Sequence, residues 1–134
     1  MAGGIEELVQ FLREEVRFND TVTLEFDQGI PSEVELEFGE GGEEDERVYY
    51  DSFLFTDGRI KLVSEVESED GTSKTKVYTI KNATWAVVVD ATTHESWSGD
   101  GWKELGIIVY GSRDVFEKVR NILEEIGVYY TVNE

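Results

Sequence analysis

The chain has 134 residues, a length typical of one domain, and its 40% hydrophobic and 12% aromatic content argues against disorder. It contains no cysteine, which excludes disulfides and cysteine-bound metals, and its net charge of −18 disfavours nucleic acids and anionic membranes as direct partners. The first residues show neither the basic start nor the apolar run of a secretory signal. We therefore expect a cytoplasmic protein, either a monomer or a homodimer.

The negative charge is concentrated in the first half of the chain. Residues 1–70 hold 21 acids and 5 bases, whereas residues 71–134 hold 9 acids and 7 bases. Between Asp20 and Glu46 there are 11 acids and no base, a pattern that attracts a basic protein surface or divalent cations. Halophilic adaptation to concentrated salt is the alternative explanation, although it would spread the charge more evenly.

The first elements are one helix and two strands. Apolar residues at helical spacing from Ile5 to Val16 predict an amphipathic helix over residues 4–17. The alternation then changes to a period of two, which predicts strands over residues 21–27 and 33–38, joined as a β-hairpin by a turn at 28–32. Residues 39–46 read as a polar loop.

The rest of the chain predicts further strands and a second helix. Asp57-Gly58 and Asp70-Gly71 are typical of hairpin turns, because glycine adopts a positive φ without steric cost. The helix 113–126 has an apolar stripe, with Ser112 as its N-cap and Gly127 as its C-cap. The expected strands are 47–56, 59–67, 74–81, 83–91, 103–110 and 128–132, with a polar loop at 92–101.

These elements indicate an α+β fold in a single domain, residues 1–134. We expect a strongly bent antiparallel sheet or partly open barrel of about seven to eight strands, with an N-terminal helix and with the C-terminal helix capping the apolar face. Whether the last strand pairs within the chain or with a second copy is left open. The expected core residues are Leu8, Leu12, Leu24, Phe26, Leu36, Leu54, Leu62, Val87, Val89, Ile107, Val109, Phe116, Val119 and Leu123.

The acidic segment supplies the candidate partner-binding residues. Glu33, Glu35 and Glu37 project to one side of one strand, and the hairpin places Glu25 and Asp27 on the same side of its neighbour. Like charges across a strand pair are destabilising, so a basic partner would relieve their repulsion. The loop adds Glu43, Glu44 and Asp45, which lack the spacing of an EF-hand, and we predict no metal site and no cofactor.

The polar loop holds a second candidate site, made of His94, Trp97 and Trp102. A catalytic triad needs a nucleophile, a base and an acid that the fold brings together, and neighbours in one loop rarely converge in that way. We therefore predict that the protein is not an enzyme. A ligand-binding loop anchored by the two tryptophans remains an alternative.

Residues Phe53 to Leu62, with their Thr56-Asp57-Gly58-Arg59-Ile60 run, resemble the hairpin motif of bacterial-type pleckstrin-homology and GRAM-like domains. The resemblance covers about residues 47–126, because the order of strands followed by an amphipathic helix is similar. It implies a sheet plugged by its C-terminal helix. Because the first strands are acidic or neutral here, it implies a protein-interaction module and not a lipid-binding one.

The sequence thus favours a non-enzymatic module whose acidic surface binds a basic protein. One alternative is a nucleic-acid mimic, such as a viral anti-defence protein, which would occupy the DNA site of a DNA-binding enzyme. A third reading is a halophile-type domain with a ligand-binding loop at 92–102.

Overall fold

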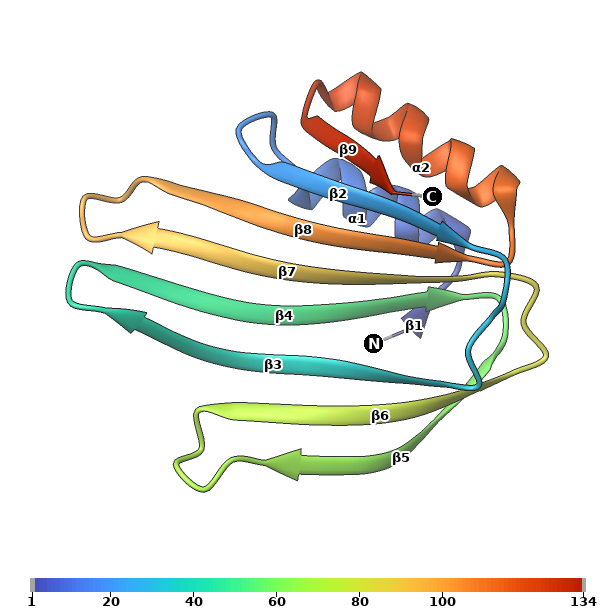
Figure 1. Cartoon of the computed structure of the whole chain (residues 1–134), viewed down its shortest axis with the longest axis horizontal. Coiled ribbons are helices and arrows are strands. Elements are labelled where there is room, and N and C mark those ends of the chain that lie inside the picture. The colour runs from blue at the N-terminus through green and yellow to red at the C-terminus, as the bar shows by residue number, and fades with distance from the viewer. Residues whose placement is uncertain (1, 134) are drawn as a thin grey trace.

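The computed structural model describes residues 2–133, with only the backbone described for Ala2, Gly3 and Glu43 (Figure 1). The elements in chain order are β1 (Ala2–Gly3), α1 (Ile5–Glu15), β2 (Thr21–Asp27), β3 (Glu33–Glu43), β4 (Glu46–Thr56), β5 (Arg59–Glu67), β6 (Ser73–Lys81), β7 (Ala86–Ser96), β8 (Gly101–Tyr110), α2 (Arg113–Ile126) and β9 (Tyr129–Asn133). The predicted α+β class is confirmed.

The strands form one open sheet in the order β5-β6-β3-β4-β7-β8-β2-β9, with β1 paired beside β4. Most neighbours are antiparallel, but β2 runs parallel to both β8 and β9, so the sheet is mixed. The unit β8–α2–β9 thereby places its two strands on either side of β2. The last strand pairs within the chain, which answers the question that the sequence left open.

Both helices cover one face of the sheet and enclose the larger core (Figure 1). Leu8 and Leu12 of α1 and Phe116 and Leu123 of α2 are fully or almost fully buried. Phe116 packs edge-on against Phe26 of β2, with ring centroids 5.6 Å apart. The caps of α2 are those expected: the Ser112 hydroxyl accepts a hydrogen bond from the Val115 N–H, and Gly127 is left-handed at φ 81°.

A second, smaller core lies on the other face of the sheet. β3 pairs with β4 only from Gly39 onward, whereas residues 33–39 pair with β6. The strands β5, β6 and the first half of β3 therefore separate from β4 and pass beneath it. Val34 and Leu36 of β3 pack there against Leu54 of β4 and Val88 of β7.

The buried Ser52 side chain connects the sheet where β3 and β4 separate. Its hydroxyl accepts a hydrogen bond from the Glu37 N–H at 3.0 Å and lies 3.2 Å from the Glu37 carbonyl and 2.7 Å from the Asp90 carboxylate. The Ser52 side chain therefore replaces the backbone hydrogen bonds that β4 no longer makes with Glu37 of β3.

The predicted hairpin between residues 21–27 and 33–38 is wrong. β2 and β3 both form, but β2 pairs with β8 and β9, and β3 pairs with β4 and β6. Residues 28–32 join these two strands. They cross from the part of the sheet where β2 pairs with β8 to the part beneath β4 where β3 pairs with β6. Alternation of apolar and polar residues determines which face of a strand is buried, but it does not determine the neighbouring strand.

Three further local predictions need correction. The predicted loop at 39–46 is a hairpin, because β3 continues to Glu43 and β4 begins at Glu46. The predicted loop at 92–101 is also mostly strand, with its turn confined to residues 97–100. The Asp57-Gly58 turn joins β4 to β5, which are not paired with each other; the Asp57 carboxylate instead accepts hydrogen bonds from Thr84 and from the Trp85 N–H.

The Asp70-Gly71 hairpin between β5 and β6 is confirmed. Hydrogen bonds from Ser68 and Thr72 hold the pKa of the Asp70 carboxyl at about 2, because they stabilise its charged form. Most predicted core residues are buried, but Leu62 is 44% exposed because it lies on the edge strand β5.

Candidate functional site

The sheet face opposite the helices is the candidate functional site. Side chains on this face belong to alternate residues of each strand, and cross-strand pairs such as Tyr50 with Thr92 and Thr92 with Glu104 show which residues share it. Its carboxylates come from five strands, and we call this set the acidic face: Glu25 and Asp27 of β2, Glu33, Glu35 and Glu37 of β3, Glu46 of β4, Asp90 of β7 and Glu104 of β8.

Strand alternation keeps lysine and arginine off one side of these five strands, although Glu40, Asp51 and Glu95 lie with the bases on the other side. Their alternate positions on the acidic face carry no lysine or arginine, and His94 is the one basic residue there. The two strong bases that these strands do contain, Arg47 and Lys103, point to the helix side. The neighbouring strands β6 and β5 carry three bases on the same side of the sheet as Glu33, namely Lys81, Arg59 and Lys61.

The predicted acidic residues are therefore brought to one face, but not by the predicted pairing. Glu33, Glu35 and Glu37 are all exposed, and their cross-strand neighbours on β6 are the uncharged Thr79, Val77 and Thr75. The strong repulsion across a strand pair that the hairpin implied is absent for these three pairs. Uncharged direct neighbours therefore reduce the repulsion that the row of carboxylates experiences.

The remaining predicted acids divide into two groups. Glu25 and Asp27 lie near Tyr110 on the acidic face; burial raises the pKa of the Tyr110 phenol, and the charges of Asp27, Glu25 and Asp90 raise it further. Glu44 and Asp45 form the turn between β3 and β4. The side chain of Glu43 lies outside the described residues.

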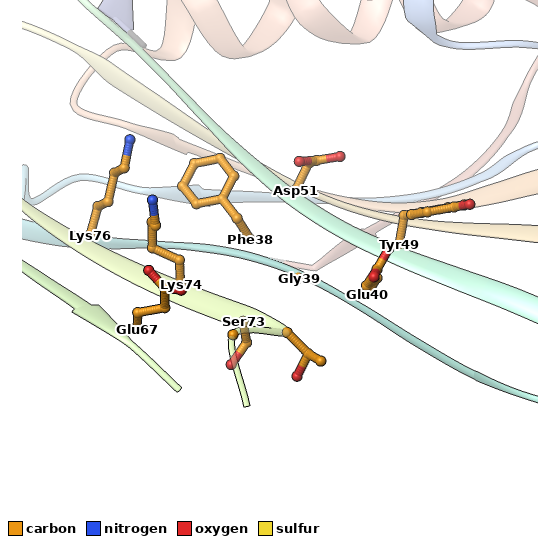
Figure 2. Close-up of a pocket in the computed structure, with 11 residues that line it drawn as sticks. Phe38, Gly39, Glu40, Tyr49, Asp51, Glu67, Ser73, Lys74 and Lys76 are labelled. Atoms are coloured by element: carbon orange, nitrogen blue, oxygen red, sulfur yellow. The ribbon is translucent and has the colours of Figure 1, made fainter. Parts of the chain in front are cut away.

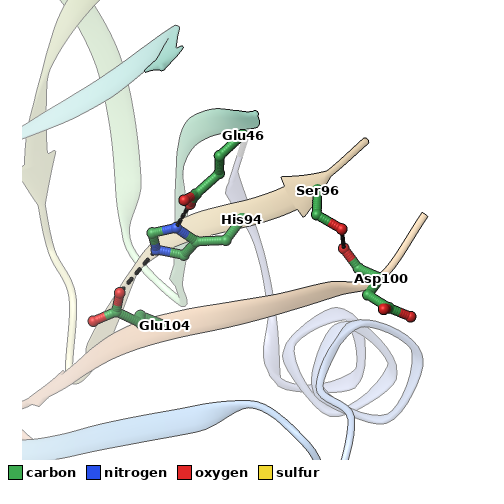
Figure 3. A network of polar contacts seen from close by, with 5 residues as sticks. All are labelled: Glu46, His94, Ser96, Asp100 and Glu104. Carbon is green, nitrogen blue, oxygen red and sulfur yellow. Dashed lines mark hydrogen bonds and ion pairs between the residues drawn. The ribbon is translucent and has the colours of Figure 1, made fainter. Parts of the chain in front are cut away.

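His94 lies on the acidic face between Glu46 and Glu104 (Figure 3). Its Nε2 lies 2.9 Å from Glu104 Oε1, its Nδ1 contacts Glu46 Oε1, and its ring stacks on Trp102 with centroids 4.3 Å apart. The hydrogen bond to Glu46 raises the pKa of His94 above its ordinary 6.5, burial opposes this, and Glu104 adds to the increase. The two ring nitrogens of His94 on β7 therefore contact Glu46 on β4 and Glu104 on β8.

The predicted ligand loop is not a single site. Trp102 belongs to the acidic face beside His94, whereas the Trp97 Nε1–H donates to the Glu44 carbonyl at 2.6 Å, and the Arg47 guanidinium lies 4.7 Å from the ring centroid of Trp97. Trp97 thus joins the tips of the β3–β4 and β7–β8 hairpins. Ser96 and Asp100 close the β7–β8 turn through backbone and side-chain hydrogen bonds and do not approach His94 as a triad would (Figure 3).

Two exposed aromatic side chains accompany the carboxylates. Tyr50 is 45% exposed and Trp102 is 43% exposed, and both lie on the acidic face. Tyrosine and tryptophan are enriched among the residues that dominate the energy of protein interfaces. The sequence pattern did not single out Tyr50, because its face depends on the pairing of β4 with β7.

The sequence also gave no sign of a groove on the helix side of the sheet (Figure 2). Its volume is about 530 Å³, and its walls and floor include Phe38 of β3, Tyr49 and Asp51 of β4, and Lys74 and Lys76 of β6. We call it the β3–β4–β6 groove. These residues come together because β3 pairs with β4 on one side and with β6 on the other.

Among residues 2–133, no group of three or more histidine, cysteine, aspartate or glutamate side chains is arranged to hold a metal ion. No described helix is long and apolar enough to cross a bilayer. Comparison with known proteins finds no matching family model, no matching curated protein and no matching solved structure. The resemblance to pleckstrin-homology and GRAM-like domains stays a prediction.

Proposed function

We propose that the protein is a non-enzymatic interaction module that binds a basic protein through its acidic face. The observation that carries this proposal is the pattern of strand alternation, which places eight carboxylates and no lysine or arginine at the positions of β2, β3, β4, β7 and β8 that point away from the helices. Clustered charge of one sign steers an oppositely charged partner toward a surface and raises its association rate.

The arrangement supports a protein as the partner because the exposed carboxylates of this face are accompanied by exposed aromatic rings. The carboxylates supply orientation and association rate, whereas Tyr50 and Trp102 offer apolar area that a partner can desolvate. An arginine of the partner would be recognised twice, by carboxylates and by an aromatic ring, because guanidinium groups stack on such rings.

The test compares capture of partners by two variants with the same change in charge. Cell extract of the source organism is passed over the immobilised wild-type protein, over Glu33→Gln/Glu35→Gln/Glu37→Gln, and over the control Glu6→Gln/Glu15→Gln/Glu124→Gln, whose side chains are exposed on the helices. We expect basic proteins to be retained by the wild type and by the control and to be lost from the first variant. Equal retention by both variants would contradict the proposal.

A second arm of the experiment distinguishes the nucleic-acid mimic. Excess duplex DNA is added to the captured partner before elution. Release by DNA would show that the acidic face occupies a DNA-binding site, whereas a partner that stays bound uses another basic surface. The salt concentration is held constant between arms, since DNA affinity depends steeply on it.

A further inference from the structure

The β3–β4–β6 groove contains an ammonium group without a carboxylate partner. Lys76 is half-buried, and its Nζ lies 5.4 Å from the ring centroid of Phe38, but no ion pair joins it to a described acid. Lys74 lies on the same side of β6 and approaches Glu65 at 3.6 Å, a partly exposed contact that is weakly stabilising. Glu65, the cross-strand neighbour of Lys76, contacts Lys74, which leaves the Lys76 ammonium without an ion pair to a described acid.

The opposite wall of the groove presents Asp51, an exposed residue. Partial burial raises the pKa of Asp51, and its carboxylate makes no hydrogen bond or ion pair with another described side chain. In Figure 2, Phe38 lies between Asp51 on one side and Lys74 and Lys76 on the other. Lys74, Lys76 and Asp51 therefore line one cavity, and neither lysine forms an ion pair with Asp51.

Two opposite charges on either side of an aromatic ring are complementary to a small zwitterion. We propose that the β3–β4–β6 groove binds a free amino acid or a molecule of that type. Its carboxylate contacts Lys76 and Lys74, its ammonium contacts Asp51, and its apolar part packs on Phe38 and Tyr49. The volume of about 530 Å³ lies within the range of about 300–1,000 Å³ that is usual for small-molecule sites.

The charges of the groove favour a zwitterion over a simple ion. Glu40 and Glu67 also line the groove, and together with the net charge of −18 they oppose a ligand that carries only negative charge. A ligand that carries only positive charge would leave Lys76 unpaired and would meet two ammonium groups. A ligand with both charges satisfies Asp51 and Lys76 at once.

This proposal does not depend on the proposed function, because the groove opens on the helix side of the sheet and the acidic face lies on the other side. The test is a titration of the ¹⁵N-labelled protein, followed by NMR, with each of the standard amino acids at about 10 mM, which detects millimolar dissociation constants. We expect at least one of them to shift the amide signals of Phe38, Asp51 and Lys76. The absence of such shifts with every amino acid would overturn the proposal.

Derivatives of the best ligand show whether the groove recognises both its ammonium and its carboxylate. The N-acetyl derivative lacks the ammonium and the amide derivative lacks the carboxylate. We expect each to bind the wild-type protein at least about tenfold more weakly, a difference that is easily resolved by titration. Equal binding of either derivative would exclude recognition of a zwitterion, and this comparison requires no variant to fold.

Matched variants then assign the two contacts. We expect Lys76→Met and Asp51→Asn each to weaken binding at least about tenfold. The controls are Lys81→Met, on the outer side of the same strand, and Glu35→Gln, on the outer side of β3. They should leave the affinity unchanged; a similar loss in the controls would show that only the overall charge matters and would overturn the assignment.

Discussion

At the scale of single residues, Ser52 is the side chain on which the split in the sheet depends. Its hydroxyl provides hydrogen bonds to the Glu37 backbone where β3 has left β4, and it is 2% exposed. A buried N–H or carbonyl without a partner costs about 1–3 kcal/mol, because its hydration is lost and not replaced.

We predict that Ser52→Ala lowers the free energy of unfolding by about 1–3 kcal/mol, since it removes the partner of the Glu37 N–H. Denaturant unfolding followed by tryptophan fluorescence measures the change. The control Ser64→Ala, at an exposed position of β5, should change stability by about 0.5 kcal/mol or less. Equal effects of the two substitutions would show that Ser52 has no special role.

His94 gives a prediction about pH, because the chain contains one histidine and its ring signal is easily identified. We expect its NMR titration midpoint to lie above 6.5, and Glu46→Gln to lower that midpoint more than Glu104→Gln does, because the Glu46 hydrogen bond is the larger cause of the increase. A midpoint at or below 6.5 would contradict the bridged arrangement.

The same shift in pKa determines how His94 contributes to stability. Because its pKa is higher in the folded chain, the contribution is fully present below 6.5 and is lost as the pH rises through the folded value. The stability difference between the wild type and His94→Gln should therefore shrink as the pH increases from below 6.5 upward. A difference that stays constant with pH would mean that the imidazolium is not the stabilising form.

At the scale of elements, the sequence predicts whether a segment is a helix or a strand more accurately than it predicts which strands pair. The helix α2 was predicted with the same bounds, because a strong apolar stripe, an N-cap serine and a C-cap glycine all agree. The hairpin of β2 and β3 was wrong, because its alternation is equally suited to the mixed arrangement that the structure shows. Periodicity carries no information about strand order.

The same limit explains which parts of the candidate sites could be predicted. Glu33, Glu35 and Glu37 were assigned to one face from their spacing alone, and the structure places them there. The placement of Asp51 and Lys76 around one groove depends on β3 lying between β4 and β6. No local pattern marks this order, so the groove could be found only from the fold.

Leu62 and Phe116 test the element packing directly, since the sequence predicts both as core residues. Phe116 is 1% exposed beneath α2, whereas Leu62 is 44% exposed on the edge strand β5. We predict that Phe116→Ala costs about 3–5 kcal/mol of unfolding free energy and Leu62→Ala about 1 kcal/mol or less, because only the first leaves a cavity. Similar losses, measured by denaturant unfolding, would place Leu62 in the core and contradict the position of β5.

At the scale of the whole molecule, the net charge of −18 must be tolerated by the fold or screened by salt. The neutral cross-strand neighbours of the β3 carboxylates indicate that repulsion is moderate. We predict that the protein is folded at about 0.1 M KCl and that its Tm rises only modestly toward 1 M, as the Debye length falls from about 10 Å to 3 Å. Folding only at high salt would instead support adaptation to a saline environment.

The acidic face is the central claim, and NMR mapping with a defined basic probe tests it most directly. A peptide rich in lysine and arginine is added to the ¹⁵N-labelled protein at low salt. We predict that the shifted amides cluster in β3, β4, β7 and β8 around Glu37, Tyr50 and His94, and that acids on α1 and α2 respond little. The claim would be contradicted if amide signals near the carboxylates of α1 and α2 shifted as strongly as those near the carboxylates of the sheet. Binding would then reflect net charge alone.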